Sequence, residues 1–305
     1  MSRLEEASPG VPQSSAGKNV GVCVVGKVKV VTDSTCDIPR ELLESLDITM
    51  VPLNVHFGTD VFKDYTELSS EEFFKKLVSD PRHPRTSQPA PGEFSAVYRK
   101  ALDDGRPVVS VHISADLSGT YQSAVIAKGD FPGAEIEVID TRLASMAAGL
   151  PVLEAARAAR EGASFQEVVA VARRAAANSG VYFVVDTLDY LHRNGRIGKA
   201  AHLIGSLLNM KPILALEEGV VVAVEKVRGK NKALATLKNL IVEKVGTKRA
   251  RLSIIHGNAP EVASRTAGDL AAAVNAVEVI TAPLGAVIGA HGGPGLVGAA
   301  YLVIE

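Results

Sequence analysis

The stretch that decides the fold is KVKVVTDSTCDIP, residues 27–39. Its first six residues, Lys27–Thr32, have the apolar, β-branched pattern of a buried β-strand. The strand runs into a polar segment, and a helical pattern begins at Arg40. Asp37 is the expected N-cap of that helix, with Pro39 in its first turn. The stretch therefore predicts a strand, a hydroxyl-bearing loop and a helix in succession.

The same alternation continues through the first half of the chain. Strands that alternate with helices imply βαβ units and a parallel sheet. The segment Thr86–Pro89, Thr-Ser-Gln-Pro, is expected to be a loop. The predicted strands are Ile48–Phe57, Pro107–Ile113 and Ile136–Asp140, and the predicted helices end at Leu77 (after a cap at Ser69 or Ser70), Leu102 and Lys128.

From about Ser145 the pattern changes to a long Ala-rich helix followed by a mixture of strands and helices. The pair Glu218-Gly219 separates two apolar strands and indicates an antiparallel hairpin. The second half is therefore predicted to be α/β with a mixed sheet. Its predicted strands are Val181–Val185, Ile213–Glu217, Val220–Val227, Arg251–His256, Ala276–Thr281, Ala286–Ala290 and Leu296–Ile304, and its later helices include one over Lys199–Leu208.

Length and composition indicate two globular domains. The 305 residues suggest two domains, which we place at 27–155 and 156–305 after a flexible tail over residues 1–26. The 33 Lys and Arg balance 34 Asp and Glu, so no global charge draws the chain to nucleic acid or to an anionic membrane. The two cysteines, Cys23 and Cys36, give no disulfide framework. With no apolar run of membrane-spanning length and no secretory pattern at the start, a cytoplasmic protein is expected.

Three hydroxyl-rich segments are the first candidates for a binding site: 33–35 (Asp-Ser-Thr), 86–87 (Thr-Ser) and 118–120 (Ser-Gly-Thr). Each precedes a predicted helix, and two follow predicted strands. In an open parallel sheet, ligands bind at the carboxyl ends of the strands, where helix N-termini offer free N–H groups. Such a site suits a carboxylate or a phosphate. The alternative is that these segments are ordinary helix caps, which favour the same residues.

The segment 288–295, Ile-Gly-Ala-His-Gly-Gly-Pro-Gly, is the most unusual one. We expect His291 to end an apolar strand and a glycine-rich turn to follow it. His291 can donate to a carboxylate or act as an acid or base, or it can be a turn histidine bonded to backbone. Arg196 and Arg228 are expected in loops, where an arginine can contact a protein or a phosphate.

Several motifs are absent from the sequence. There is no G-x-x-x-x-G-K-[ST] loop for ATP, no G-x-G-x-x-G after the first strand and no G-x-S-x-G elbow. The absence of the elbow weakens a serine-hydrolase interpretation of Ser118 with His291. No spacing of His, Cys and Asp suggests a catalytic metal, and we expect no cofactor.

The order of several motifs resembles that of the DegV family from about Lys29 to the C-terminus. These motifs are VTDSTCDIP, TSQP, LSGTYQSA, DTLDYL, GRI, KPIL and HxGPG in one fixed order. The turn here reads HGGPG, where Thr is common after His, and the helix end reads HRNGR, where Gly-Gly is common.

The resemblance implies a specific fold and ligand. The fold would be two α/β domains, a parallel three-layer sheet domain followed by a mixed-sheet domain with a lipid tunnel, and a long-chain fatty acid bound between them. Its carboxylate would be held by Thr86, Ser118, the backbone N–H of Gly119, and His291. The hydroxyls of Ser34, Thr35, Ser87 and Thr120 would form a secondary head-group region.

The resemblance also implies a partner. The protein would present the acid to a separate ATP-binding fatty acid kinase subunit, which makes the acyl-phosphate, and Arg196 and Arg228 would contact that kinase. The protein alone would not turn over substrate, and its membrane contact would be at most transient. Two alternatives stay open: a hydrolase or acyl transferase with Ser118 as nucleophile and His291 as base, and a binding module for another amphipathic carboxylate or lipid.

Overall fold

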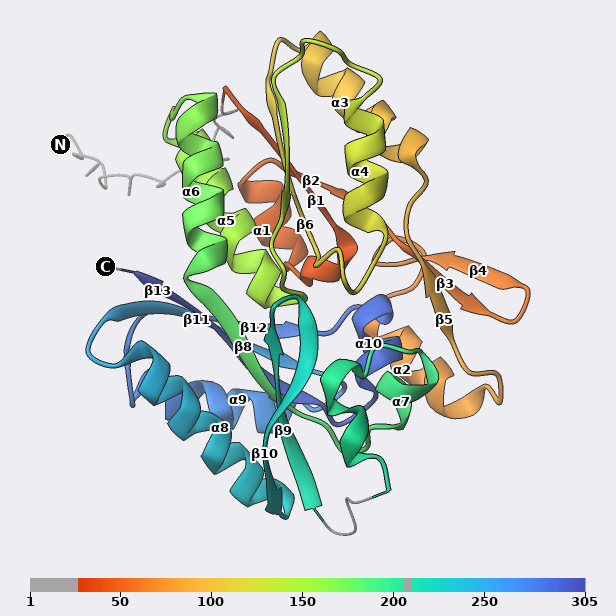
Figure 1. Cartoon of the computed structure of the whole chain (residues 1–305), viewed down its shortest axis with the longest axis vertical. Helices are drawn as coiled ribbons and strands as arrows, with labels where there is room; N and C mark the ends of the chain where they lie inside the picture. The colour runs from red at the N-terminus through yellow and green to blue at the C-terminus, as the bar shows by residue number, and fades with distance from the viewer. Residues whose placement is uncertain (1–26, 206–209, 305) are drawn as a thin grey trace, which may run out of the picture.

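The first sheet is parallel and lies at the centre of three layers. The computed structural model describes residues 27–205 and 210–304. The order of the four strands is β2-β1-β6-β7, all parallel, with α3 and α4 on one face and α5 and α6 on the other (Figure 1). This confirms the predicted α/β fold with a parallel sheet. The elements of this part are β1 (Lys29–Asp33), α1 (Arg40–Ser45), β2 (Ile48–Val51), α3 (Pro91–Asp103), β6 (Val108–His112), α4 (Thr120–Lys128), β7 (Ile136–Asp140), α5 (Met146–Arg160) and α6 (Phe165–Ala177).

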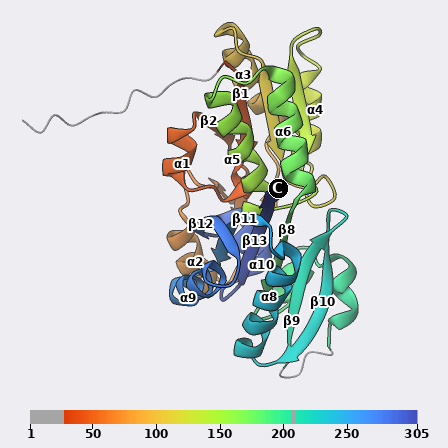
Figure 2. The ribbon, with the colours of Figure 1, turned by 90° about the vertical axis from the view of Figure 1, so that its left-hand side faces the viewer.

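The second sheet has six strands in the order β10-β9-β8-β13-β11-β12 and is mixed, as predicted. Only the β11–β12 pair is parallel. The β9–β10 hairpin turns at Glu218 and Gly219, which both have positive φ, 50° and 84°. Figure 2 shows α5 and α6 above this sheet, and α8 and α9 beside it. The elements are β8 (Ser179–Val184), β9 (Met210–Glu217), β10 (Val220–Arg228), α8 (Lys230–Val245), β11 (Arg249–His256), α9 (Pro260–Ala271), β12 (Asn275–Pro283) and β13 (Val297–Ile304).

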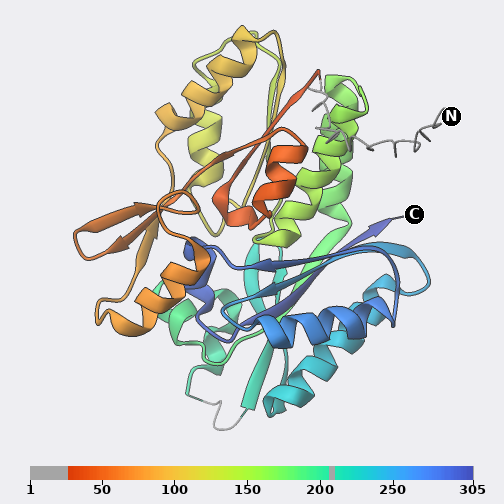
Figure 3. The same cartoon turned by 180° about the vertical axis from the view of Figure 1, so that it is seen from behind.

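A small antiparallel sheet, β4-β3-β5, forms a third group together with short helices from the second half of the chain. Helix α10 packs on α2, α7 and the strands β3 and β5 (Figure 3). Segments far apart in sequence therefore share one wall of the molecule. The elements are the 3-10 helix η1 (Ser34–Cys36), β3 (Asn54–Phe57), β4 (Asp60–Lys63), α2 (Ser70–Ser79), β5 (Arg85–Ser87), α7 (Asp189–Arg193), the 3-10 helix η2 (Gly198–Leu203) and α10 (Ala286–Gly292).

Helix α5 connects the two large sheets. It packs against β1 and β6 of the parallel sheet and against β8, β11 and β13 of the mixed sheet. Its buried face is rich in alanine, and it contributes to one hydrophobic core that includes Val30 from the first sheet and Leu302 from the second. The proposed boundary after residue 155 falls inside this helix. The predicted tail over residues 1–26 lies outside the described residues, as do residues 206–208 of the predicted helix 199–208.

The structure corrects four local predictions. Ala286–Ala290 is not a strand but most of helix α10, and Thr86-Ser87 lies in strand β5 instead of a loop. The predicted strand Ile48–Phe57 is two strands, β2 and β3. Asp37 does not cap α1, whose N-cap is Pro39. Asp37 has a left-handed backbone, φ 51°, and its side chain bonds elsewhere.

Candidate functional site

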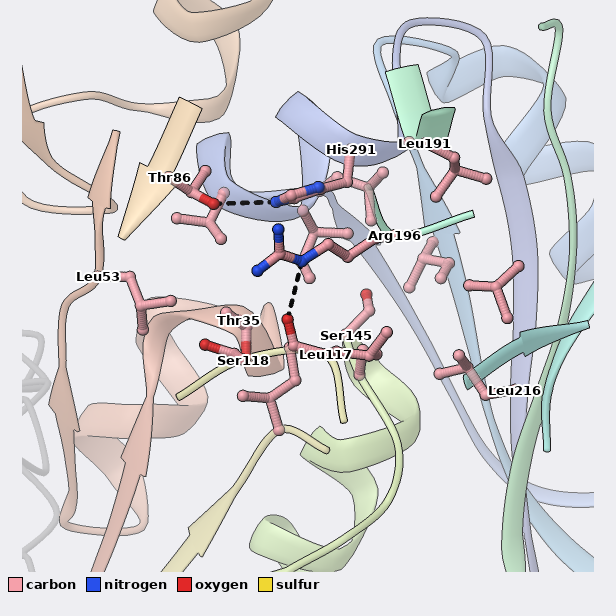
Figure 4. A pocket seen from close by; sticks show the side chains of 18 of the residues that line it. Thr35, Leu53, Thr86, Leu117, Ser118, Ser145, Leu191, Arg196, Leu216 and His291 are labelled. Carbon is pink, nitrogen blue, oxygen red and sulfur yellow. Dashed lines mark hydrogen bonds between the residues drawn. The ribbon is translucent and has the colours of Figure 1, made fainter. Parts of the chain in front are cut away.

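A pocket opens where the carboxyl edge of the parallel sheet meets the mixed sheet and α10 (Figure 4). Its empty space, which includes solvent at the open mouth, is about 850 Å³. Most of the wall is aliphatic or aromatic, so the pocket fits an apolar ligand. The apolar lining comprises Leu53, Ile113, Leu117, Val181, Phe183, Leu191, Leu216, Val221, Ile255, Leu284, Val287, Ile288 and Leu296.

The polar groups of the pocket include Thr86, Ser118 and His291, three of the four predicted carboxylate ligands. Thr86 comes from β5, Ser118 from the β6–α4 loop and His291 from the last turn of α10. The Thr86 hydroxyl and His291 Nε2 are 2.9 Å apart and hydrogen-bonded. Ser118 Oγ is 2.9 Å from Thr120 Oγ1 and does not bond to His291. The fold thus gathers two hydroxyls and an imidazole around one pocket.

Gly119, the fourth predicted ligand, directly follows Ser118 but is not among the residues that line the pocket. It is the N-cap residue of α4, and within residues 27–205 and 210–304 no group accepts a hydrogen bond from its N–H. A Cβ built at this position would lie 3.0 Å from Nε2 of Gln88, a residue of the pocket wall. Glycine therefore lets the Gln88 side chain approach the start of α4 closely.

His291 is a neutral imidazole at physiological pH. Burial lowers the pKa of His291 to about 4, and the positive charge of Arg196 adds to this effect. Its Nδ1 is closed off from solvent and has no hydrogen-bond partner among the described residues. The ring therefore acts through Nε2 and the Thr86 hydroxyl, and no carboxylate orients it from the other side.

Arg196 lines the pocket, a position that its sequence context did not indicate. Its Nε donates to the carbonyl of Leu117 at 3.0 Å and one terminal nitrogen donates to the carbonyl of Asn194 at 2.9 Å. In Figure 4 the guanidinium lies between His291 and Leu117. Because carbonyls hold it and it forms no ion pair with a carboxylate of the described residues, its charge is available to an anion in the pocket.

The four secondary hydroxyls divide into two groups. Thr35 and Ser87 line the pocket, although Ser87 Oγ already bonds to His56 Nε2 at 2.9 Å. Ser34 and Thr120 are fully buried and do not line it. Ser34 Oγ accepts the N–H of Leu53, and Thr120 bonds to Ser118. These last two hydroxyls support the loops that carry pocket residues.

A chain of buried hydrogen bonds lies beneath Thr35. The Tyr98 hydroxyl donates to Ser110 Oγ at 2.8 Å, and Ser110 Oγ is hydrogen-bonded to His112 Nε2 at 2.7 Å. His112 Nδ1–H then donates to Asp33 at 2.8 Å, and Asp33 also accepts from Thr35. The Ser–His–Asp order resembles a catalytic triad, but all three residues are fully buried, and none lines the pocket.

The sequence did not identify three residues that line the pocket, Gln88, Ser145 and Arg196. It also missed the polar chain beneath Thr35. Arg228, the other predicted partner contact, is exposed at the end of β10 and outside the pocket. For two of these residues the sequence position was a usable signal. Gln88 lies within the Thr-Ser-Gln-Pro segment, and Arg196 directly follows the glycine that ends a helix.

Comparison with known proteins identifies the family. The model of the DegV family, described as an uncharacterised protein family, matches residues 27–303. The chain belongs to the DegV family. A DegV domain-containing protein of Streptomyces coelicolor is 41% identical over 274 residues, which cover 89% of this chain and 96% of the relative. Protein DegV of Bacillus subtilis is 35% identical over 273 residues, 89% of this chain and 97% of that protein.

Solved structures show the same fold. A DegV family protein from Thermus thermophilus, described for its fatty acid binding, superposes with a TM-score of 0.87 at 38% identity and covers 91% of this chain and 100% of its own. A stearic acid-binding protein from Eubacterium ventriosum gives a TM-score of 0.84 at 28% identity, over 90% of this chain and 98% of its own. The two-sheet α/β layout of this DegV-family chain is therefore shared with solved relatives.

Two further findings bear on the type of site. Across residues 27–205 and 210–304, no group of three or more His, Cys, Asp or Glu side chains is arranged to hold a metal ion. In the same part of the chain, no helix is both long and apolar enough to cross a membrane.

Proposed function

We propose that this protein binds a long-chain fatty acid in the pocket and presents the carboxylate to an ATP-binding kinase subunit for phosphorylation to an acyl-phosphate. The observation that carries the binding step is one pocket with an aliphatic wall and a polar cluster of Thr86, Ser118 and His291. The solved relatives described as fatty-acid-binding proteins support it.

The head group would be held by neutral donors together with one cation. The hydroxyls of Thr86 and Ser118 and the free N–H of Gly119 are hydrogen-bond donors for a carboxylate. Since His291 is neutral, Arg196 supplies the positive charge at this end. A single carboxylate therefore matches the site better than a polyanion.

The apolar wall would hold the acyl chain. Burying about sixteen methylenes at ~0.8 kcal/mol each gives an upper limit of about 13 kcal/mol, before the costs of ordering the chain. Tight retention of a long chain is thus compatible with a modest polar site. A free acid of this kind would partition into membrane, which explains the need for a carrier.

Presentation to the kinase would place Arg196 and Arg228 at the contact. Arg196 lies at the pocket and is exposed, and Arg228 is exposed at the end of β10. Neither forms an ion pair within the described part of the chain, so both are available to acidic groups of a partner. In this role the protein acts as the substrate-carrying subunit and has no turnover of its own.

The hydrolase interpretation finds less support in the geometry. A nucleophilic serine needs a base within hydrogen-bond reach and a third group that orients the base. Ser118 bonds to Thr120, and His291 bonds to Thr86. The Nδ1 of His291 has no partner among the described residues that would orient it.

Two assays test the proposal. In the first, delipidated protein is incubated with radiolabelled octadecanoic acid or its methyl ester and passed over a desalting column. We expect stoichiometric retention of the acid and weaker retention of the ester, which lacks the charge that Arg196 would pair with. Equal failure to retain either ligand would contradict fatty acid binding.

In the second assay, the loaded protein is mixed with a bacterial fatty acid kinase subunit and ATP. We expect acyl-phosphate formation, with Arg228→Ala lowering the rate at least tenfold while the bound acid is kept. Lys226→Ala, an exposed cation on the same strand, is the matched control. No acyl-phosphate from a fully loaded wild-type protein would overturn the presentation step.

A further inference from the structure

The first turn of α10 is held by two buried carboxylates from the other half of the chain. Asp37 Oδ1 accepts the N–H of Gly285 at 2.8 Å, and Asp64 Oδ1 accepts the N–H of Ala286 at 2.9 Å. The other oxygen of Asp37 accepts the hydroxyl of Ser145, at the start of α5. Asp37 and Asp64 are 2% and 0% exposed. Three segments of the first half thus meet at the start of one helix of the second half.

Among the residues that the structure describes, no lysine or arginine forms an ion pair with these two acids. Within residues 27–205 and 210–304, Asp64 Oδ2 also has no hydrogen-bond partner. Both carboxylates flank Gly285: a Cβ built there would lie 3.0 Å from Asp37 Oδ1 and 3.3 Å from Asp64 Oδ1. Buried charges without a counterion are costly, so the pair is poised to take up a proton.

The pKa values of both groups reflect this environment. Burial raises the pKa of Asp64 to about 6, while hydrogen bonds from the Ser34 hydroxyl and from Ala286 N–H oppose the rise. Burial also raises the pKa of Asp37 well above its usual range, and the charges of Asp64 and Asp33 add to the rise.

The helix that they hold is a wall of the pocket. Val287, Ile288 and His291 of α10 line it, as does Leu284 just before the helix. Movement of the first turn would displace the imidazole that bonds to Thr86 and would open the apolar wall. The position of the head-group site therefore depends on the stability of the contact between α10 and the two carboxylates.

We propose that Asp37 and Asp64 are positioning residues for the head-group site, because they dock the first turn of α10, and that protonation of this pair strengthens the docking. The effect on ligand release rests on the proposed fatty acid binding, whereas the docking itself does not.

The direction of the pH effect follows from the linkage between protonation of Asp64 and docking of α10. Asp64 holds its proton up to about pH 6 when α10 is docked, but only up to about pH 4 when the carboxyl is exposed to water. Docking is therefore favoured at low pH and weakens as pH rises through 6, by about tenfold in the opening equilibrium between pH 5 and pH 8.

Other titratable and charged groups near the pair are few. Asp33 faces Asp37, and Tyr65 faces both acids, with Glu41 and Arg40 of α1 next to Tyr65. From α5 the contact is the uncharged hydroxyl of Ser145. His291 lies at the opposite end of α10, and its lowered pKa, about 4, keeps it neutral over the pH range of interest.

The test compares wild type with Asp64→Asn, which keeps the acceptor for Ala286 N–H and cannot ionise. Amide hydrogen exchange of α10 is measured from pH 5 to pH 8 and corrected for the intrinsic pH dependence of exchange. We expect the opening equilibrium of wild type to rise about tenfold over this range. Asp64→Asn should show a flat profile, and Asp269→Asn, which removes an exposed carboxylate on α9, should follow wild type.

A flat wild-type profile, or one shared by wild type and Asp64→Asn, would overturn the proposal. If Asp64→Asn does not fold, the Asp64 carboxyl of wild type is titrated by carbon-13 NMR instead, and the absence of a transition near pH 6 would overturn the proposal. The same proteins are then loaded with the fluorescent fatty acid cis-parinaric acid, and its transfer to phosphatidylcholine vesicles is followed. A transfer rate that rises with pH in wild type alone supports control of release. Failure to load with the exchange difference intact would contradict fatty acid binding only.

Discussion

His112 and His291 differ in how they use their ring nitrogens. His112, at the end of β6, is fully buried, and both nitrogens are bonded, one to Ser110 and one to Asp33. His291 bonds through Nε2 to Thr86, and its Nδ1 has no partner among the described residues. Only His291 lines the pocket. A histidine whose bonds are completed inside the fold stabilises it, whereas one that shares a hydroxyl with a pocket can serve a ligand.

The comparison is tested most strongly by His112→Ala. The substitution leaves the buried Asp33 carboxylate without its imidazole donor, and losing a hydrogen bond to a buried charged group typically costs about 1.5–3 kcal/mol. We expect a decrease of that size in the free energy of unfolding, measured in urea. His192→Ala, at an exposed histidine of α7, is the control and should change it little. A loss below about 1 kcal/mol would show that the polar chain is not a structural unit.

The pH dependence of folding stability tests the environment of His291, the second histidine of this pair. Since burial lowers the pKa of His291 to about 4, folding favours the neutral ring. Its contribution is fully present above about pH 6.5 and is lost as pH falls towards 4, by at most about 3 kcal/mol. The loss should be smaller in His291→Gln, which does not titrate there. Urea unfolding of both proteins at pH 7 and pH 4.5 measures the difference, and parallel losses would contradict the assignment.

Ligand affinity should also respond to the loss of His291. His291→Ala removes the partner of Thr86 at the head group, and we expect fatty acid affinity to fall about tenfold to thirtyfold. Displacement of a fluorescent fatty acid measures this. His83→Ala, near the pocket but outside its lining, is the matched control. Unchanged affinity in His291→Ala would place the histidine with His112 as a structural residue.

The smallest expected effect belongs to Ser118→Ala. It removes one neutral donor while Thr86, His291 and the N–H of Gly119 stay in place, so affinity should fall about five- to tenfold. The control is Ser123→Ala, at a serine of α4 that does not line the pocket. Wild-type affinity together with a wild-type rate of acyl-phosphate formation would remove Ser118 from the site.

Much of the fold could be predicted because its signals are local. The strand at 29–33 and the β9–β10 hairpin follow from short patterns of apolar and turn residues. Ser69 was one of two expected caps for α2, and its side chain does cap that helix together with Glu72. Because β1 and β6 are adjacent parallel strands, their carboxyl ends bring Thr35 and Ser118 to the same pocket, as the topology rule requires.

The wrong local predictions fall where contacts with residues distant in sequence determine the structure. A five-residue apolar run such as 286–290 fits a strand or a buried helix equally well. It is a helix here, and its first turn is hydrogen-bonded by Asp37 and Asp64, which are 248 and 222 residues away from their partners. The local pattern predicts that Asp37 caps the next helix along the chain, but its side chain binds the start of α10 instead. Arg196 likewise reaches the pocket only because its guanidinium is held by the carbonyl of Leu117, 79 residues earlier.

The central claim is that the apolar pocket with its hydroxyl and imidazole cluster holds a long-chain fatty acid. Native mass spectrometry of the purified protein, followed by solvent extraction and lipid analysis, tests it most directly. We expect one long-chain fatty acid per chain, whose length and double bonds define the specificity of the pocket. An empty protein that also fails to take up added fatty acid would contradict it.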